Sequence, residues 1–230
     1  DAILVSLALE EAGREGLLDH PYFEKFGDFL LHGLSPGFTG KANFSDARYR
    51  LRPMPHLYFL ARRFDRPDWQ WAAREVFRRA RRSDTRGPWG LIWFDPDAPA
   101  KPPPCNTRCR LFTNTHFAFL RDSWDAGARY LAVPAGSLAY GHRHRDVGSF
   151  LLEQFGERQV ADPGTHHYYT EDPWHVRPEA HSTLLVNGRG MAERGDSEVL
   201  DRVEPDAGDA YGLVTEMDCG DAADIVRIDA

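Results

Sequence analysis

The spacing of apolar residues changes near residue 87, and this change constrains what the chain can fold into. Before it, apolar side chains recur every three or four residues, as on a helix that buries one face. We expect helices at residues 2–13, 21–32, 53–64 and 67–82. After it, short apolar runs separated by Gly, Pro and Asp are typical of antiparallel strands. We expect these strands at residues 91–94, 117–120, 130–133, 149–155, 159–161 and 183–186.

The pattern predicts an α+β protein with two domains. We assign residues 1–86 to a helical domain and residues 87–230 to an antiparallel β domain. The proline-rich stretch 96–104 is interpreted as an ordered loop of the second domain. No apolar segment reaches the length of a transmembrane helix, so we expect no membrane partner.

The formal net charge of −7 is unevenly distributed along the chain. Residues 47–86 contain 12 arginines, whereas residues 192–230 contain 12 acidic side chains and three arginines. The arginines alternate with aromatic residues and alanines at helical spacing, which favours a solvated helix face over a nucleic-acid site. We therefore expect no nucleic-acid partner, and the composition does not fix an oligomeric state.

The cysteine count gives little guidance, because three residues cannot all pair within one chain. Cys105 and Cys109 lie in one loop and could pair in an oxidising compartment, but unpaired loop thiols are the interpretation adopted here. The chain starts at Asp1 and an apolar helical pattern follows at once, without a leader sequence. We expect the true N-terminus to be missing.

Three side chains of the kind that bind metal ions lie at the ends of short apolar runs between residues 131 and 186. They are His144, Asp162 and His181, and two imidazoles with one carboxylate form a common set for zinc or iron. The intervals of 18 and 19 residues allow each ligand to come from its own neighbouring strand. If residues 142–146 are extended, His142 and His144 share one face. A metal-free core, in which the histidines bond to Asp162, is the alternative, and we expect the metal.

These motifs resemble the heparinase II/III-like family of polysaccharide lyases. The resemblance rests on His142-x-His144-x-Asp146-x-Gly148-Ser149-Phe150, Asp162-Pro163-Gly164, Tyr168-Tyr169 and Ala180-His181-Ser182-Thr183-Leu184. Looser matches are Asp19-His20-Pro21-Tyr22-Phe23 and Asn43-Phe44-Ser45-Asp46, which are similar to the last helices of the family's toroid, and Phe119 to Trp124, similar to its first sandwich strand.

The resemblance implies a fold and an activity. The fold is the end of an (α/α) toroid followed by an antiparallel β-sandwich, truncated at both ends. The activity is β-elimination of uronic-acid-containing glycans such as heparin, heparan sulfate or alginate, and an acidic polysaccharide is the expected partner. A lyase of such polymers works in the periplasm or outside the cell, which is the expected localisation.

The resemblance also implies roles for individual residues. His144, Asp162 and His181 match the family's zinc ligands, so Zn²⁺ is the expected cofactor, and His142 matches the catalytic histidine that faces substrate. Arg177 is our candidate for gripping a carboxylate or sulfate, and Tyr168 and Tyr169 for stacking on sugar rings. The family's other catalytic groups lie on earlier toroid helices, so we expect residues 1–230 alone to be catalytically deficient.

Two other functions stay open at this point. Gly136 followed by His142-x-His144 reproduces the start of a cupin motif, which would indicate a metal-dependent oxygenase or isomerase. A cupin next needs a glutamate where this chain has Gly148 and Ser149. The other possibility is a non-catalytic module that binds acidic glycans without turning them over.

Overall fold

The computed structural model describes residues 2–80, 88–137, 142, 144–165, 174–188, 190, 211–220 and 224–229. The chain divides into two compact units. The helical unit comprises Asp1–His32 and Leu51–Pro103, and the strand unit comprises Gly33–Arg50 and Pro104–Ala230. This division differs from the single boundary expected near residue 86, because the segment Gly33–Arg50 groups with the strands and residues 88–103 group with the helices. Most of the proline-rich stretch 96–104, expected in the second domain, is therefore in the helical unit.

The helical unit contains α1 (Ala2–Glu11), α2 (Pro21–His32), α3 (Pro55–Arg63), α4 (Pro67–Arg79) and the short α5 (Trp89–Trp93). The helices α2, α3 and α4 each begin with a proline, whose fixed φ and missing N–H suit the first helical position. Trp69 of α4 is fully buried, and its indole N–H donates to Asp28 of α2. Leu57, Leu60, Ala72 and Val76 complete the buried face of α3 and α4.

The expected strand at residues 91–94 is wrong, because Trp89–Trp93 is a helix. The indole rings of Trp89 and Trp93, one helical turn apart, stack with centroids 5.0 Å apart. Leu91 is 84% exposed, so this run does not form a buried strand. A run of only a few apolar residues is too short for its periodicity to distinguish a helix from a strand. Nowhere in the described part of the chain is a helix long and apolar enough to cross a membrane.

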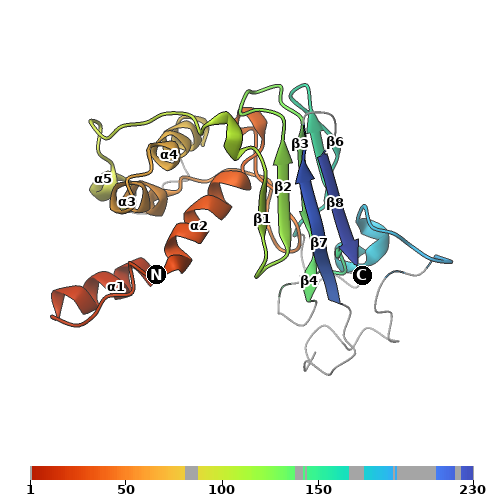
Figure 1. Cartoon of the computed structure of the whole chain (residues 1–230), viewed down its shortest axis with the longest axis horizontal. Coiled ribbons are helices and arrows are strands. Elements are labelled where there is room, and N and C mark those ends of the chain that lie inside the picture. The colour runs from red at the N-terminus through yellow and green to blue at the C-terminus, as the bar shows by residue number, and fades with distance from the viewer. Residues whose placement is uncertain are drawn as a thin grey trace. The chain divides into compact units, whose positions relative to one another are not determined.

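The strand unit contains two antiparallel sheets (Figure 1). The larger one has the order β1-β2-β3-β5-β6 and the smaller one β4-β7-β8. The strands are β1 (Arg110–Phe112), β2 (Phe117–Arg121), β3 (Tyr130–Pro134), β4 (Gly136–Ser137), β5 (Leu151–Gln154), β6 (Glu157–Val160), β7 (Tyr211–Cys219) and β8 (Asp224–Asp229).

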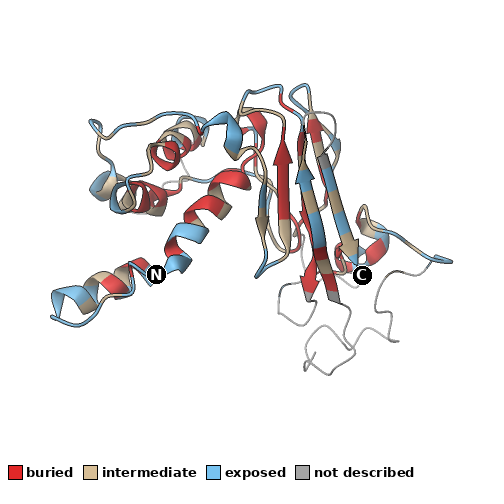
Figure 2. Cartoon of the chain, viewed as in Figure 1, coloured by how far each residue is buried: buried red, intermediate tan, exposed pale blue. Residues whose placement is uncertain are grey.

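One apolar cluster joins the two sheets. Ala118 and Leu120 of β2 and Val133 of β3 pack with Val214 of β7, and Ile228 of β8 lies against the same cluster. Figure 2 shows β2 as a buried strand, whereas β7 and β8 carry exposed as well as covered positions. In β7 the buried positions lie near its start, and in β8 exposed positions alternate with partly buried ones, as in strands with one face on a core.

Two segments expected to be extended have irregular backbones instead. In the first, His142 has a φ of +66°, which a strand does not allow, so the argument that alternation alone aligns His142 with His144 is wrong. In the second, residues 183–185 form no strand, and the Thr183 hydroxyl donates to the Val147 carbonyl over 2.7 Å. Side chains here supply hydrogen bonds that a ladder would otherwise provide.

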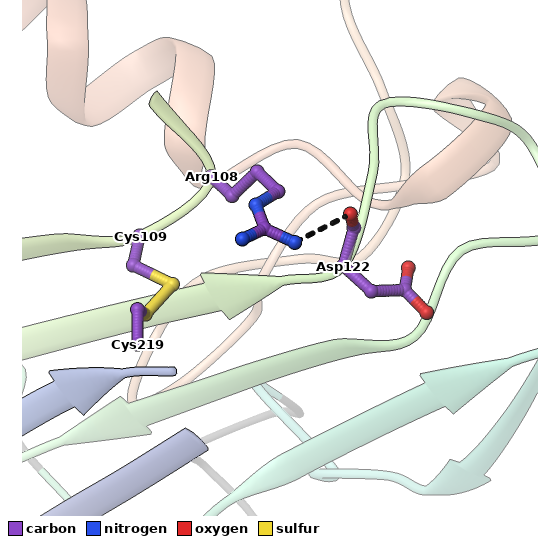
Figure 3. Close-up of a disulfide and its surroundings, with 4 residues drawn as sticks. All are labelled: Arg108, Cys109, Asp122 and Cys219. Atoms are coloured by element: carbon purple, nitrogen blue, oxygen red, sulfur yellow. Dashed lines mark hydrogen bonds between the residues drawn. A yellow bond between two sulfur atoms is a disulfide. The ribbon is translucent and has the colours of Figure 1, made fainter. Parts of the chain in front are cut away.

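A disulfide joins Cys109 to Cys219, with their Cα atoms 6.4 Å apart. Figure 3 shows it linking the residue before β1 to the end of β7. The Arg108 guanidinium, drawn beside it, donates to the Asp122 backbone oxygen over 3.2 Å. The interpretation of Cys109 as an unpaired loop thiol is therefore wrong. The pairing depends on the contact between two sheets, which sequence spacing does not reveal.

We expect one reactive thiol per denatured, unreduced chain, that of the exposed Cys105. Replacing both Cys109 and Cys219 by serine should lower the free energy of unfolding by about 2–5 kcal/mol, because the bond closes a long loop in the unfolded chain. Thiol counting and urea unfolding measure the two effects, with Cys105→Ser as the control that leaves stability unchanged. A disulfide-linked peptide containing Cys105 would contradict the pairing.

Candidate functional site

Two histidines and a carboxylate meet inside the strand unit. The metal-binding atoms of His144, Asp146 and His181 all lie within 4.8 Å of one another. All three residues are buried, with exposed fractions of 1%, 0% and 8%. A buried cluster of this composition requires either hydrogen-bond partners or a cation, because isolated charges are costly away from water.

Asp146 presents one engaged oxygen and one that is open. Its Oδ2 accepts two hydrogen bonds from Ser45, from the backbone N–H over 2.8 Å and from the hydroxyl over 2.9 Å. Among the described residues, none donates a hydrogen bond to Oδ1, which is buried. Ser45 therefore holds the carboxylate while leaving one oxygen for another ligand.

Asp162 lies on the other side of His181. Its Oδ2 is 2.7 Å from His181 Nδ1, and both side chains are completely buried. Its Oδ1 accepts from the Gly164 N–H over 2.9 Å, and the Asn43 amide donates to its backbone oxygen over 2.9 Å. Both carboxylate oxygens of Asp162 are therefore engaged within the protein, in contrast to those of Asp146.

A third carboxylate, Asp46, contacts the two histidines of the His142-x-His144 motif. Its Oδ1 is 3.1 Å from His144 Nε2, and its Oδ2 contacts His142 Nδ1. The His144 side chain is 0% exposed and that of His142 is 82% exposed, so one carboxylate joins the buried centre to a solvent-facing ring. The ring of His175, also buried, packs edge-on against that of His144 with centroids 5.2 Å apart.

The geometry fits a metal ion. Burial lowers the pKa of His144, an effect that Asp146 and a hydrogen bond to Asp46 oppose, and the neutral imidazole is the form that binds metal. Histidines that bind metal usually have a carboxylate or carbonyl on their other ring nitrogen. Asp162 takes that position at His181 and Asp46 at His144. Imidazole nitrogens with a carboxylate oxygen are the donors that zinc accepts.

The structure brings some of the expected site residues together. His144 and His181 share the buried centre, with Asp162 against His181. His142 contacts Asp46, which also contacts His144. Arg177 is exposed and precedes the short 3₁₀ helix Pro178–Ala180. Tyr168 and Tyr169 lie outside the described residues, and the assignment of Asp162 as a direct ligand stays a prediction.

Sequence reasoning missed Asp46 and gave Asp146 no role. Asp46 precedes His142 by 96 residues, and no spacing rule connects a loop carboxylate to a histidine over that distance. Asp146 could have been predicted as a site residue, because it lies two residues after His144 in the His142-x-His144-x-Asp146 motif. The motif Asn43-Phe44-Ser45-Asp46, read as similar to toroid helices, is a loop of the strand unit.

A family model described as heparinase II/III-like, C-terminal, matches residues 106–225, more than half of the chain. The chain belongs to the heparinase II/III-like family. The matched range includes the three buried site residues His144, Asp146 and His181 together with Asp162, whereas Ser45 and Asp46 precede it. Membership in this family leaves the cupin interpretation without support.

The chain is also similar to individual heparinase II/III-like proteins. A heparin-sulfate lyase from Bacteroides stercoris is 28% identical over 111 residues, which are 46% of this chain and 16% of that protein. The structure of heparan sulfate lyase HepC from Pedobacter heparinus is 17% identical, with a TM-score of 0.57 over 85% of this chain and 26% of that one. A heparinase III structure is 18% identical, with a TM-score of 0.61 over 91% and 30%. At these identities the structural likeness shows the fold.

Gly164 offers a test of how the family's Asp-Pro-Gly turn supports the site. Its φ is +59°, and an added Cβ would lie 2.4 Å from the Ala47 carbonyl oxygen. We expect Gly164→Ala to lower the free energy of unfolding by more than the backbone cost of about 1–2 kcal/mol, because the Asn43–Ala47 loop must move.

Gly156→Ala is the matched control for this substitution. Gly156 has a φ of +79° and nothing within 4 Å of an added Cβ, so it isolates the backbone cost. Urea unfolding of both variants gives the comparison. Equal losses of stability in the two variants would show that the close approach of Gly164 to residues 43–47 is not a constraint.

Proposed function

We propose that the chain is part of a polysaccharide lyase that cleaves uronic-acid-containing glycans of the heparin or heparan sulfate type. Its family membership supports this, as do the names of its relatives, a heparin-sulfate lyase and a heparan sulfate lyase. The observation that carries the proposal within the molecule is the exposed His142 ring held beside the buried cluster of His144, Asp146 and His181. The chain spans only 16% of its curated relative, so the activity of the whole protein is inferred.

The proposed reaction sets requirements for the side chains of the site. In β-elimination a base removes the C5 proton of the uronate, the C4–O4 bond breaks, a C4–C5 double bond forms, and an acid protonates the departing oxygen. His142 is our candidate for contacting the reacting sugar, because it is the exposed ring of the site. Arg177 is the candidate for the uronate carboxylate or a sulfate, and Tyr168 and Tyr169 for stacking on the sugar rings.

We propose further that the helical unit is the end of an (α/α) toroid and that the strand unit belongs to a β-sandwich. The structural likeness to heparinases supports this assignment. The apolar cluster shared by the two sheets is the kind of core that a sandwich requires. Alginate is a less supported substrate, because the similar proteins are named for heparin and heparan sulfate.

We propose a periplasmic or secreted location for the protein, because Cys109 and Cys219 form a disulfide. Disulfides form and persist in oxidising compartments and are rare in reducing ones. A polymeric glycan substrate agrees with such a location, since large polysaccharides are met outside the cytoplasm.

We expect the protein to release unsaturated uronate from heparan sulfate. The product is measured by its ultraviolet absorbance. Because we expect residues 1–230 alone to be catalytically deficient, the protein is used in excess over the glycan so that slow elimination is detected. His142→Ala should abolish the absorbance change without weakening glycan binding to the same degree. Equal binding of heparan sulfate and of its unsaturated product, with no elimination, would instead favour a non-catalytic glycan-binding module.

We propose that zinc occupies the buried cluster, held by His144 and His181 with a carboxylate. Zinc bound there would organise the side chains around it. Two carboxylates compete for the role of ligand: Asp162, which the family resemblance implies, and Asp146, whose Oδ1 is open. Loss of a direct ligand should remove stoichiometric zinc, whereas loss of an orienting partner typically costs 10- to 100-fold in affinity.

We expect one zinc ion per chain by elemental analysis, and none in His144→Ala. Zinc titration of Asp146→Ala and Asp162→Ala then ranks the two carboxylates, and the variant that loses stoichiometric binding identifies the ligand. Asp122→Ala, which removes a surface carboxylate paired with Arg129, is the control and should keep its zinc. If neither the purified protein nor the zinc titration shows bound metal, the cluster is a hydrogen-bonded core without a metal ion.

A further inference from the structure

We propose that Asp46 is a positioning residue, which fixes the orientation and the tautomer of the exposed His142 ring at the site. This inference rests on the function proposed above, in which His142 contacts the glycan. It assigns a role to a loop residue that lies before the family-matched range 106–225 and belongs to none of the motifs that identify the buried cluster.

The contact itself is the first observation. Asp46 directs one carboxylate oxygen to His142 Nδ1 and the other to His144 Nε2. The Asp46 side chain is 24% exposed and the His142 side chain is 82% exposed, so Asp46 is the more enclosed member of the pair. A carboxylate at Nδ1 favours the tautomer with the proton on that nitrogen. The opposite nitrogen, Nε2, then carries the lone pair and can accept a proton from a substrate.

The backbone is the second observation. His142 has a φ of +66° and Ser45, the neighbour of Asp46, has a φ of +52°. Residues other than glycine enter this region at an energetic cost, because the Cβ atom then lies too close to the backbone. Such conformations persist where surrounding contacts hold them, and they concentrate at functional sites. Ser45 is held by its two hydrogen bonds to Asp146, so the loop that carries Asp46 is itself anchored to the buried cluster.

An exposed imidazole without a partner rotates freely and samples both tautomers, so it meets a substrate in the productive geometry only part of the time. Asp46 removes that freedom. A positioned proton-transferring side chain contributes about 10²- to 10⁴-fold to a rate. Loss of the orientation of His142, with its imidazole retained, should remove a part of this rate contribution. We expect the maximal elimination rate to fall by about 10- to 100-fold.

The first test is spectroscopic and needs no turnover. The ring nitrogens of His142 are observed by ¹⁵N NMR at alkaline pH, and His142→Gln identifies the signals by their loss. We expect the Nδ1–H tautomer in the wild-type protein and a shift towards Nε2–H in Asp46→Ala. Identical His142 signals in the wild-type protein and in Asp46→Ala would overturn the proposal.

The second test separates positioning from binding. With the protein in excess over heparan sulfate, Asp46→Ala should lower the maximal elimination rate by about 10- to 100-fold and change the half-saturating protein concentration by less than about 2-fold. Asp122→Ala is the control for removing a carboxylate and should match the wild-type protein. A change confined to half-saturation would contradict the positioning role.

Zinc content is measured in the same samples, because Asp46 also contacts His144. Asp46→Ala protein that keeps zinc and shows the altered His142 tautomer supports the proposal directly. Zinc loss with unaltered His142 signals would assign Asp46 to His144 alone and overturn it. If the wild-type chain forms no unsaturated uronate, as its expected catalytic deficiency allows, the NMR comparison alone decides the role of Asp46.

Discussion

The candidate site depends on hydrogen bonds from one short loop to irregular backbone and buried carboxylates. Asn43 holds the backbone of Asp162, Ser45 holds the Asp146 carboxylate, and Asp46 contacts His142 and His144. The segments that carry these residues have no strand ladder at these positions, and buried polar groups without partners are costly. The loop supplies these partners. Segment 33–50 is therefore part of the strand unit although helices flank it in the sequence.

The start of this segment is fixed by a buried arginine. The guanidinium carbon of Arg121 of β2 lies over the rings of Trp124 and Tyr130, at 4.0 and 4.6 Å from their centroids, and the guanidinium donates to the Leu34 carbonyl. Burial lowers the pKa of Arg121 to about 10, so it stays charged at neutral pH. Burial also raises the pKa of Glu153, which accepts a hydrogen bond from Ser35 over 2.7 Å. Buried charges are costly, and the segment that carries Asp46 supplies a hydrogen-bond partner to each of these two.

Sequence patterns predicted what local periodicity and turn chemistry determine. The four longer helices lie where apolar spacing and prolines placed them. His144 and His181 do lie close together, although the strands expected to bring them there are not formed. Contacts between distant segments could not be predicted in this way. The Cys109–Cys219 bond spans 110 residues and the Asp46–His142 contact 96, and both depend on how the loops and sheets come together. The division of roles between Asp146 and Asp162 depends on which oxygens Ser45 and Gly164 occupy, which has no counterpart in spacing.

The three carboxylates of the site differ in what they contact, and this difference argues for an organising role of the buried centre. Asp162 contacts His181 and the Gly164 N–H, and Asp146 has one oxygen that accepts no hydrogen bond from the described residues. Asp46 contacts both the buried His144 and the exposed His142. A cation at the cluster would fix His144, and a fixed His144 would hold one oxygen of Asp46. The other carboxylate oxygen of Asp46 would then have a fixed position from which to contact His142. Order at the solvent-facing ring would in this way follow from order at the centre, without any contact between the cation and the sugar.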